Sequence, residues 1–353
     1  MTKRKVCILF GGQSSEHSVS CVSASYVTEN LNSEMYEVYR IGITRQGKWM
    51  LYEGSTEDMR SGAWEQHPGN CPAVITPDAT LHGITLLGPD GVRTIPLDVV
   101  FPVLHGLYGE DGTVQGLLEL ARIPYVGPHV LASATAMDKV TAKILFAAAG
   151  LHQAKWVWFP AHWLRQHGEE AIGQVENAFP YPVYVKPANA GSSIGITKAE
   201  NRQQLAEAFE EAMRHDSRIV VEETIVGREL ECAVLGNEEP IASPVGEVLP
   251  SVDFYDFDAK YNSDVPNTQV PAQLDEETSR RLREEAVRAY RTLNCVGLSR
   301  VDFFLQPDGT IILNEINTLP GFTAISMYPQ LFAVSGLPYG KLLDELIRYA
   351  LED

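Results

Sequence analysis

The sequence predicts a protein of mixed α/β and α+β class that contains more than one domain. Strand and helix patterns alternate along the chain, which is typical of sheets covered by helices. Its 353 residues correspond to two or three domains of about 150 residues each. An apolar fraction of 44% is ordinary for a globular protein and excludes wholesale disorder.

The first unit begins with a buried strand. Residues 6–10 form a continuous apolar run that ends in two glycines, and a helix pattern follows. This order is typical of a parallel strand, a tight turn and a helix. Residues 99–104 repeat the pattern, with a glycine-rich turn and a helix over 114–122. We therefore expect residues 1–126 to form an open α/β domain.

Two further units follow, a central one over 127–223 and a C-terminal one over 224–353. The central unit has helix patterns at 137–149 and 202–213 and strand patterns at 182–186, 193–198 and 218–223. The C-terminal unit has a strand pattern at 230–235, a long helix pattern at 276–293 and a hairpin at 300–317. Within the C-terminal unit, between the strand at 230–235 and the helix at 276–293, residues 250–266 are irregular and rich in Asp and aromatic residues. This composition predicts a lid loop.

Charge and cysteine content exclude several classes of protein. Acidic residues outnumber basic residues by 46 to 28, which gives a net charge of −18. This excess repels phosphate backbones and disfavours nucleic-acid binding. No apolar run reaches the ~18 residues of a membrane span, so we expect no membrane association. Five scattered cysteines, none in a C-x-x-C pair, indicate buried free thiols in a reducing cytoplasm.

The predicted C-terminal hairpin is the most informative segment. An Asp-Gly pair at 308–309 between two β-prone runs is the strongest short hairpin signal in a sequence. A two-residue loop there places Asp302 opposite Glu315 and Arg300 opposite Asn317. Because side chains alternate along a strand, all four then project from one face.

This pairing predicts a cation site. Two directly opposed carboxylates lie only ~5 Å apart at Cβ and destabilise the hairpin unless a cation lies between them. Asp302, Glu315 and the amide oxygen of Asn317 form a hard oxygen set that suits Mg²⁺ rather than Zn²⁺. The alternative is a surface hairpin in which Arg300 neutralises Asp302.

A small-residue turn at 189–195 follows a strand that ends near Lys186. Small residues let backbone N–H groups approach phosphate oxygens closely, although an ordinary hairpin loop is the alternative. The sequence has neither a Walker A pattern nor a G-x-G-x-x-G motif after the first strand. A nucleotide, if bound, is therefore held by another scheme.

Five segments that occur in order give the chain a family resemblance. They are 11–20 (GGQSSEHSVS), 105–112 (HGLYGEDG), 137–139 (MDK), 186–195 (KPANAGSSIG) and 314–323 (NEINTLPGFT). The series closely resembles the D-alanine–D-alanine ligases, bacterial cell-wall enzymes of the ATP-grasp fold, across nearly the whole chain. The resemblance implies a three-domain ATP-grasp architecture with the nucleotide held between the central and C-terminal domains.

The resemblance also implies a reaction and its partners. The reaction is the ATP-dependent ligation of two D-alanines to D-alanyl-D-alanine through an acyl phosphate, for peptidoglycan precursors. Phosphoryl transfer depends on positioning and charge neutralisation more than on covalent help. ATP and two Mg²⁺ ions, with Mn²⁺ as a substitute, are the implied cofactors. A cytoplasmic homodimer is the implied assembly.

Roles for individual residues follow from the same resemblance. Asp302, Glu315 (bridging) and Asn317 hold the metal ions. Lys139, Lys186 and the lid residue Lys260 contact the phosphates. Glu222 accepts from the adenine amine and Glu229 binds the ribose. The full nucleotide set comprises Lys139, Lys186, Ser193, Glu222, Glu223, Ile225, Glu229 and Lys260.

At the acyl centre, Arg300 and the N–H of Gly321 are implied to stabilise the developing oxyanion. Glu16 is implied to bind the ammonium of the first D-alanine, and His105 lies near that substrate. The alternative for Glu16 is a helix-start carboxylate that complements the helix dipole. The alternative for His105 is a buried histidine bonded to the backbone.

Ser326 and Met327 lie where the family places the second substrate. Tyr261 in the lid is implied to link to Ser192 and Glu16, which closes the lid and excludes water. Related D-alanine–D-lactate ligases usually lack this tyrosine, so its presence favours D-alanine as second substrate. A D-alanine–D-lactate or D-alanine–D-serine ligase, and an inactive ATP-grasp binding module, remain the alternatives.

Overall fold

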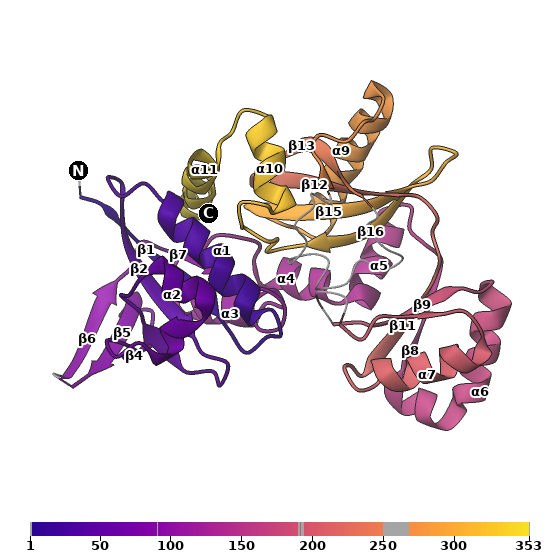
Figure 1. The fold of residues 1–353 in the computed structure, drawn as a ribbon, viewed down its shortest axis with the longest axis horizontal. Coiled ribbons are helices and arrows are strands. Elements are labelled where there is room, and N and C mark those ends of the chain that lie inside the picture. The colour runs from indigo at the N-terminus through magenta and orange to yellow at the C-terminus, as the bar shows by residue number, and fades with distance from the viewer. Residues whose placement is uncertain (1, 90, 190, 192–193, 250–267, 353) are drawn as a thin grey trace.

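A computed structural model describes residues 2–89, 91–189, 191, 194–249 and 268–352. Three sheets of seven, four and five strands carry the described fold. Figure 1 places the seven-stranded sheet at one end of the molecule, the four-stranded sheet at the other and the five-stranded sheet above them. This confirms the predicted mixed α/β and α+β class. Among the described helices, none combines the length and the apolar character that a membrane crossing requires.

The seven-stranded sheet has the order β6-β5-β4-β3-β2-β1-β7. Its parallel part consists of β1 (Arg4–Gly11), β2 (Tyr36–Ile43) and β7 (Val99–Val103). Its antiparallel part consists of β3 (Trp49–Leu51), β4 (Cys71–Ile75), β5 (Gly83–Gly88) and β6 (Gly91–Pro96). The sequence predicts β1 and β7, whereas the antiparallel extension was not predicted.

Strand β1 divides its side chains between two cores. Val6, Ile8 and Phe10 face one core, and Cys7 and Leu9 face the other. The first core is covered by helices α1 (His17–Asn30) and α11 (Tyr339–Glu352), and the second by α3 (Thr113–Ala121). The short elements α2 (Thr56–Ser61) and η1 (Ala63–Gln66) also pack on the first core. Strands buried on both faces explain the continuous apolar runs.

The four-stranded sheet is antiparallel and has the order β10-β9-β11-β8. Its strands are β8 (Trp156–Pro160), β9 (Val183–Pro187), β10 (Thr197–Ala199) and β11 (Arg218–Glu223). Helices α6 (Ala161–Ala178) and α7 (Arg202–Ala212) cover one face, where Val185 and Val221 enter the core. Because side chains alternate, Lys186 and Glu222 project from the opposite face.

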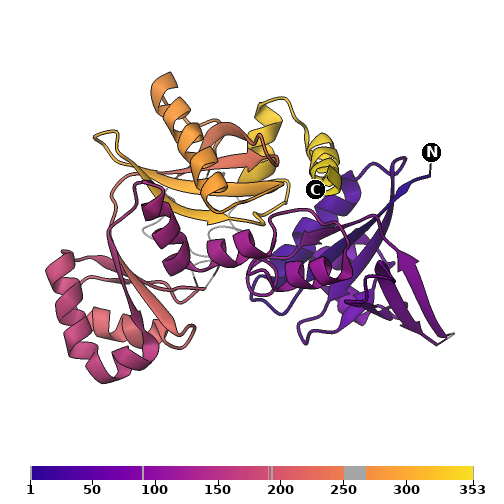
Figure 2. The same cartoon turned by 180° about the vertical axis from the view of Figure 1, so that it is seen from behind.

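The five-stranded sheet has the order β14-β13-β12-β15-β16. Its strands are β12 (Arg228–Leu235), β13 (Ile241–Val248), β14 (Thr268–Gln269), β15 (Leu298–Leu305) and β16 (Ile311–Asn317). Helices α9 (Glu276–Thr292) and α10 (Met327–Val334) pack on it. Helices α4 (Val130–Met137) and α5 (Lys139–Ala148) also contribute to its core and run between the outer sheets in Figure 2.

Candidate active site

The β15–β16 hairpin carries the residues around which the site is built. Its register places Asp302 opposite Glu315 and Arg300 opposite Asn317, as the sequence predicts. The intervening pair, Val301 and Ile316, enters the apolar core. The polar residues therefore occupy one face of the hairpin, and the apolar residues anchor the other.

The turn of this hairpin differs from the prediction. The N–H of Gln306 donates to the carbonyl of Thr310 at 3.0 Å, so three residues form the loop rather than two. Gly309 takes the positive φ of 83° that such a loop requires at its last position. A bulge between Asp302 and Phe303 then shifts the register by one and restores the pairing. The predicted loop length was wrong, whereas the predicted pairing is confirmed.

Arg300 is held by carboxylates from two strands. Its Nε and Nη2 atoms donate to the two oxygens of Asp302 at 2.7 and 2.6 Å, and Nε lies 3.0 Å from Glu231 Oε2. The Nδ2 atom of Asn317 also donates to Asp302, at 2.9 Å. Burial alone would lower the pKa of Arg300, but Asp302 and Glu231 raise it well above its ordinary value. Arg300 therefore remains a fixed cation.

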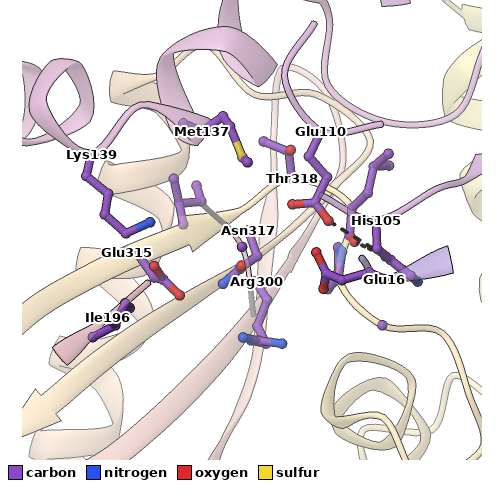
Figure 3. Close-up of a pocket in the computed structure, with 16 residues that line it drawn as sticks. Glu16, His105, Glu110, Met137, Lys139, Ile196, Arg300, Glu315, Asn317 and Thr318 are labelled. Carbon is purple, nitrogen blue, oxygen red and sulfur yellow. Dashed lines mark hydrogen bonds and ion pairs between the residues drawn. The ribbon is translucent and has the colours of Figure 1, made fainter. Parts of the chain in front are cut away.

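A polar cavity of about 110 Å³ lies above this hairpin (Figure 3). Five separate segments contribute to its lining. They are the start of α1, the loop after β7, the junction of α4 and α5, the segment between β9 and β10 that carries Gly191 and Ile196, and the hairpin with the loop that follows it. Its lining includes Glu16, His105, Glu110, Lys139, Arg300, Glu315, Asn317 and Gly321. In Figure 3, Lys139 and Glu315 lie on one side of the cavity and the Glu16, His105 and Glu110 cluster on the other.

Glu16 is enclosed by backbone. It is the residue that precedes α1, yet its side chain makes no capping hydrogen bond and lines the cavity instead. A Cβ atom at Gly106 would lie 2.4 Å from Glu16 Oε2, and one at Gly191 would lie 2.8 Å from it. Glycine at both positions therefore lets two loops close around this carboxylate.

His105 connects the cavity to the loop that carries Gly321. Its Nδ1 atom donates to the carbonyl of Leu319 at 3.0 Å, and Nε2 lies 3.2 Å from Ser23 Oγ. Burial would lower the pKa of His105, but Glu110, 3.7 Å away, and Glu16 raise it. The backbone-bonded histidine considered from the sequence is therefore present, and its side chain also lines the cavity.

Lys139 is fixed at the start of α5. The side chain of Asp138 caps this helix by accepting from the N–H of Thr141 at 2.7 Å. The N–H of Lys139 donates to the carbonyl of Ala188 at 3.0 Å, just beyond β9. Burial lowers the pKa of Lys139, against the opposing effect of Glu315. Its ammonium thus enters the site from a capped helix.

A second, narrow cavity adjoins the first and shares Lys139 and Glu315 with it. Lys143, Lys186 and Glu222 also line it. Lys186 Nζ lies 2.7 Å from Glu222 Oε2, and Lys143 Nζ lies 3.0 Å from Glu222 Oε1. Burial would raise the pKa of Glu222, but Lys143 and Lys186 together lower it to about 2. This cavity therefore presents three lysines and an ionised carboxylate.

The donor set on the hairpin suits a divalent cation. Asp302 and Glu315 face each other, and Asn317 adds an amide from the same face. Within the described part of the chain, no cluster of three or more His, Cys, Asp or Glu side chains could bind a metal. The set is thus two carboxylates and one amide, a hard oxygen set of the kind Mg²⁺ accepts. A cation at Asp302 would replace the hydrogen bonds from Arg300 and Asn317.

Sequence models of a single ligase family match both halves of the chain. The description "D-ala D-ala ligase N-terminus" matches residues 5–128, and "D-ala D-ala ligase C-terminus" matches residues 145–348. This chain belongs to the D-Ala–D-Ala ligase family. The resemblance predicted from the sequence motifs is therefore confirmed.

Curated relatives in this family match over nearly their full length. A D-alanine–D-alanine ligase of Ruminiclostridium cellulolyticum is 50% identical, covering 100% of this chain and 96% of the relative. One of Bacillus cytotoxicus is 47% identical, covering 100% and 97%.

Solved structures agree. The VanG D-Ala:D-Ser ligase of Enterococcus faecalis has a TM-score of 0.89 at 42% identity and covers 99% of this chain and 100% of that chain. The D-alanine–D-alanine ligase of Coxiella burnetii has a TM-score of 0.86 at 34% identity and covers 99% and 96%. The ATP-grasp architecture expected for the family is thus confirmed.

The two cavities of this ligase-family chain bring together much of the predicted site. They gather Glu16, His105, Lys139, Lys186, Glu222, Arg300, Glu315, Asn317 and Gly321, with Asp302 bonded to Arg300. Neither cavity is lined by Glu223, Ile225, Glu229, Ser326 or Met327. Met327 is buried in the first core, and Ser326 Oγ accepts from the N–H of Thr323 at 2.9 Å. The predicted residues Ser192, Ser193, Lys260 and Tyr261 lie outside the described residues.

Three residues of the site were not predicted from the sequence. Lys143 follows Lys139 by one helical turn, so the i, i+4 spacing placed it on the same face. Glu231 lies opposite Asp302 on β12, and only the strand order reveals that pairing. Glu110 belongs to the 105–112 motif. Because it follows His105 by only five residues, the sequence could have shown that the two side chains lie near each other.

Proposed function

We propose that this chain joins two D-alanines to D-alanyl-D-alanine, with ATP converted to ADP and phosphate. One observation carries the proposal: a single cavity holds groups suited to an amino-acid ammonium, to phosphate and to an oxyanion. These are the Glu16 carboxylate, the Lys139 ammonium and the Arg300 guanidinium, in that order. The family of the chain supports the same reaction.

The narrow cavity is proposed as the nucleotide site. Lys139 and Lys186 would neutralise phosphate oxygens, and Glu222 would accept from the adenine amine. Glu229 would bind the ribose, with Glu223 and Ile225 beside the base. Ser193 and Lys260, which lie outside the described residues, are proposed to close over the phosphates. Three lysines around a buried carboxylate support this assignment because phosphoryl transfer depends on charge neutralisation.

Divalent cations are proposed to bind on the hairpin. Asp302, Glu315 and Asn317 would hold two Mg²⁺ ions, or Mn²⁺ in their place, with Glu315 bridging. The ions would neutralise phosphate charge during transfer. In this assignment Arg300 passes from Asp302 to Glu231, which lies 3.0 Å from its Nε atom. The guanidinium would therefore keep a buried anionic partner.

The proposed reaction has two steps. First, a carboxylate oxygen of one D-alanine bonds to the γ-phosphorus and ADP leaves. Second, the amine nitrogen of the other D-alanine bonds to the acyl carbon, the bond from that carbon to the phosphate oxygen breaks, and the leaving phosphate takes the proton that the amine loses. Glu16 would hold the ammonium of the first substrate beside His105. Arg300 and the Gly321 N–H would stabilise the oxyanion of the tetrahedral intermediate.

The second substrate is assigned as D-alanine. The lid residue Tyr261, with Ser192 and Glu16, is proposed to close the site and favour an amine nucleophile over a hydroxyl one. Ser326 and Met327 are proposed to lie beside that substrate. Similarity to the VanG D-Ala:D-Ser ligase makes D-serine the second candidate.

Mass spectrometry of the products tests these proposals. Purified protein is incubated with ATP, Mg²⁺ and D-alanine, alone and with D-serine or D-lactate. We expect D-alanyl-D-alanine to dominate each mixture, with phosphate released in equal amount. Dominant D-alanyl-D-serine or depsipeptide would overturn the assigned second substrate, and the absence of ADP and product would leave an inactive binding module. The Tyr261→Phe variant should increase depsipeptide or acyl phosphate hydrolysis.

Three further properties are part of the proposal. The three sheets support domains over 1–126, 127–223 and 224–353. The lid proposed at 250–266 rests on the sequence pattern, because those residues lie outside the described ones. The five unpaired cysteines and the use of ATP support a cytoplasmic location. A homodimer is proposed from the family, and sedimentation would test it.

A further inference from the structure

A buried lysine next to the proposed nucleotide site has no assigned role. Lys143 lies on α5 and is only 3% exposed. Its apolar neighbours on the helix, Ala142 and Phe146, belong to the core. Replacing an ion pair at such a depth by apolar residues of similar size is often neutral or even stabilising. A role in function therefore explains this lysine better than a role in stability.

The contacts of Lys143 indicate what that role is. Its Nζ atom lies 3.0 Å from Glu222 Oε1, while Lys186 Nζ lies 2.7 Å from the other oxygen, Oε2. No described residue forms a hydrogen bond of good geometry with Lys143 Nζ. Lys143 thus acts on Glu222 through charge at one oxygen, and Lys186 binds the other.

Lys186 and Glu222 have competing tasks if the proposed function is correct. The ammonium of Lys186 must reach phosphate oxygens, yet Glu222 attracts it. Glu222 must present an anionic oxygen to the adenine amine. If Lys186 were its single lysine partner, however, the ammonium would attract both carboxylate oxygens. A second cation beside Glu222 relieves this competition, because it divides the carboxylate charge between two partners.

We propose that Lys143 is a positioning residue of the nucleotide site: it shares Glu222 with Lys186, so that Lys186 can bind phosphate while Glu222 selects adenine. The inference rests on the proposed function, because Lys143 has no such task without a nucleotide. The charges agree with it. Burial would raise the pKa of Glu222, and the two lysines lower it to about 2. Burial would likewise lower the pKa of Lys186, and Glu222 raises it.

The base preference follows from the chemistry of the carboxylate. An ionised carboxylate only accepts hydrogen bonds, so it pairs with the 6-amino group of adenine. The 6-oxo group of hypoxanthine is also an acceptor and would be repelled. Loss of Lys143 should therefore weaken binding of ATP and also reduce its advantage over ITP.

The test compares Lys143→Met with the wild-type chain. Methionine keeps the length of the side chain and removes the charge. Calorimetric titration of ATP and ITP with Mg²⁺, in the absence of D-alanine, measures nucleotide binding apart from ligation. We expect the Kd for ATP to rise at least about tenfold and the ATP-over-ITP preference to fall by a similar factor. In turnover, KM for ATP should rise while kcat at saturating ATP changes less than about threefold.

Two controls separate this role from a structural one. Lys341→Met removes an exposed lysine on α11 and should leave binding unchanged. Lys143→Arg keeps the charge and should keep the Kd for ATP within about threefold of wild type. If the methionine variant does not fold, a larger rise of this Kd in folded Lys143→Arg would contradict the proposal, because the charge beside Glu222 is still present. In a Glu222→Gln background, Lys143→Met should have little further effect, because the two residues act together.

The proposal fails if Lys143→Met changes the Kd for ATP by less than about twofold. It also fails if the ATP-over-ITP preference is unchanged, or if the loss is equally large in the Glu222→Gln background, because Lys143 would then act on the nucleotide directly. Wild-type protein that binds ATP but forms no dipeptide would overturn the proposed function alone. The binding comparison would still decide the role of Lys143.

Discussion

Glu231 on β12 lies directly opposite Asp302 on β15. Asp302 in turn lies opposite Glu315 on β16, so three carboxylates form a row across three adjacent strands. Like charges placed opposite each other destabilise a sheet. Arg300 offsets the first pair by contacting both of its carboxylates. Glu315, at the other end of the row, faces the ammonium groups of Lys139 and Lys186 instead, and its charge raises the pKa of both lysines against the effect of burial.

Replacing Glu231 should separate turnover from binding. In Glu231→Ala, Arg300 keeps Asp302 as its single partner and is drawn away from the acyl centre. We expect kcat to fall about tenfold or more, while the Kd for ATP changes little, because the ion pair that anchors Arg300 to a buried carboxylate is lost. Steady-state kinetics and calorimetry measure the two quantities. Glu239→Ala, an exposed change nearby, serves as the control, and wild-type kcat in Glu231→Ala would refute the anchoring role.

Glu315→Gln should abolish turnover that depends on Mg²⁺ and leave the fold intact. The change removes a proposed anionic ligand, and it also removes one of two opposed carboxylates, so the hairpin itself is relieved of repulsion. We expect activity to fall at least about a hundredfold at any Mg²⁺ concentration. Activity against Mg²⁺ and the circular dichroism spectrum are the measurements. Asp308→Asn at the tip of the same hairpin should be neutral, and near-wild-type activity in Glu315→Gln would rule out the metal assignment.

The low pKa of Glu222 predicts how stability depends on pH. Its folded value of about 2 lies below the ordinary value of 4.5, so ionised Glu222 stabilises the folded state above pH 4.5. The contribution is about 3 kcal/mol at pH 7 and is lost as the pH falls from 4.5 towards 2.

Urea unfolding of wild type and Glu222→Gln measures this dependence. The difference in unfolding free energy should be constant between pH 8 and pH 6 and should narrow by about 1 kcal/mol at pH 4. Glu207→Gln, an exposed change on α7, should show no such narrowing. A difference that stays constant down to pH 4 would mean that the two lysines do not hold Glu222 ionised.

Thiol reactivity should single out one cysteine. All five cysteines are unpaired, and only Cys71 is partly exposed. Burial raises the pKa of Cys7, and it raises those of Cys21, Cys232 and Cys295 to about 12. Since the thiolate is the reactive form, a disulfide reagent at pH 8 should label one thiol rapidly in the native protein and five in denaturant. Cys71→Ser should remove the rapid phase, and a second rapidly labelled thiol would contradict the burial of the other four cysteines.

The sequence-based expectation that all five cysteines are buried is corrected at Cys71, which is partly exposed.

The hairpin shows how far sequence reasoning extends. The pairing of Asp302 with Glu315 was predicted correctly from a loop that was one residue too short. The bulge between Asp302 and Phe303 shifts the register by one residue and so cancels that error. Turn signals fix where a hairpin reverses, whereas bulges depend on the strands packed beside it.

Other parts of the site were beyond local pattern. Lys143 and Glu231 act through Glu222 and Arg300, which are distant in sequence, so their roles depend on which strands become neighbours. The antiparallel extension β3–β6 was missed because most of its strands, β4 and β6 above all, are partly exposed, which weakens their apolar signal. By contrast, β1, β7, α9 and β11 have strong periodicity or continuous apolar runs, and their positions were predicted closely.

The packing of α11 has a consequence for how the chain folds as it is made. Leu343 and Ile347 of this helix share a core with Val6 and Phe10 of β1. A ribosome must therefore synthesise more than three hundred further residues before the first strand can acquire its complete cover. Until then an apolar face of the N-terminal sheet is open to other chains and to chaperones. Completion of this fold is consequently a late event in translation, and deletion of α11 should yield a chain that aggregates rather than a smaller stable enzyme.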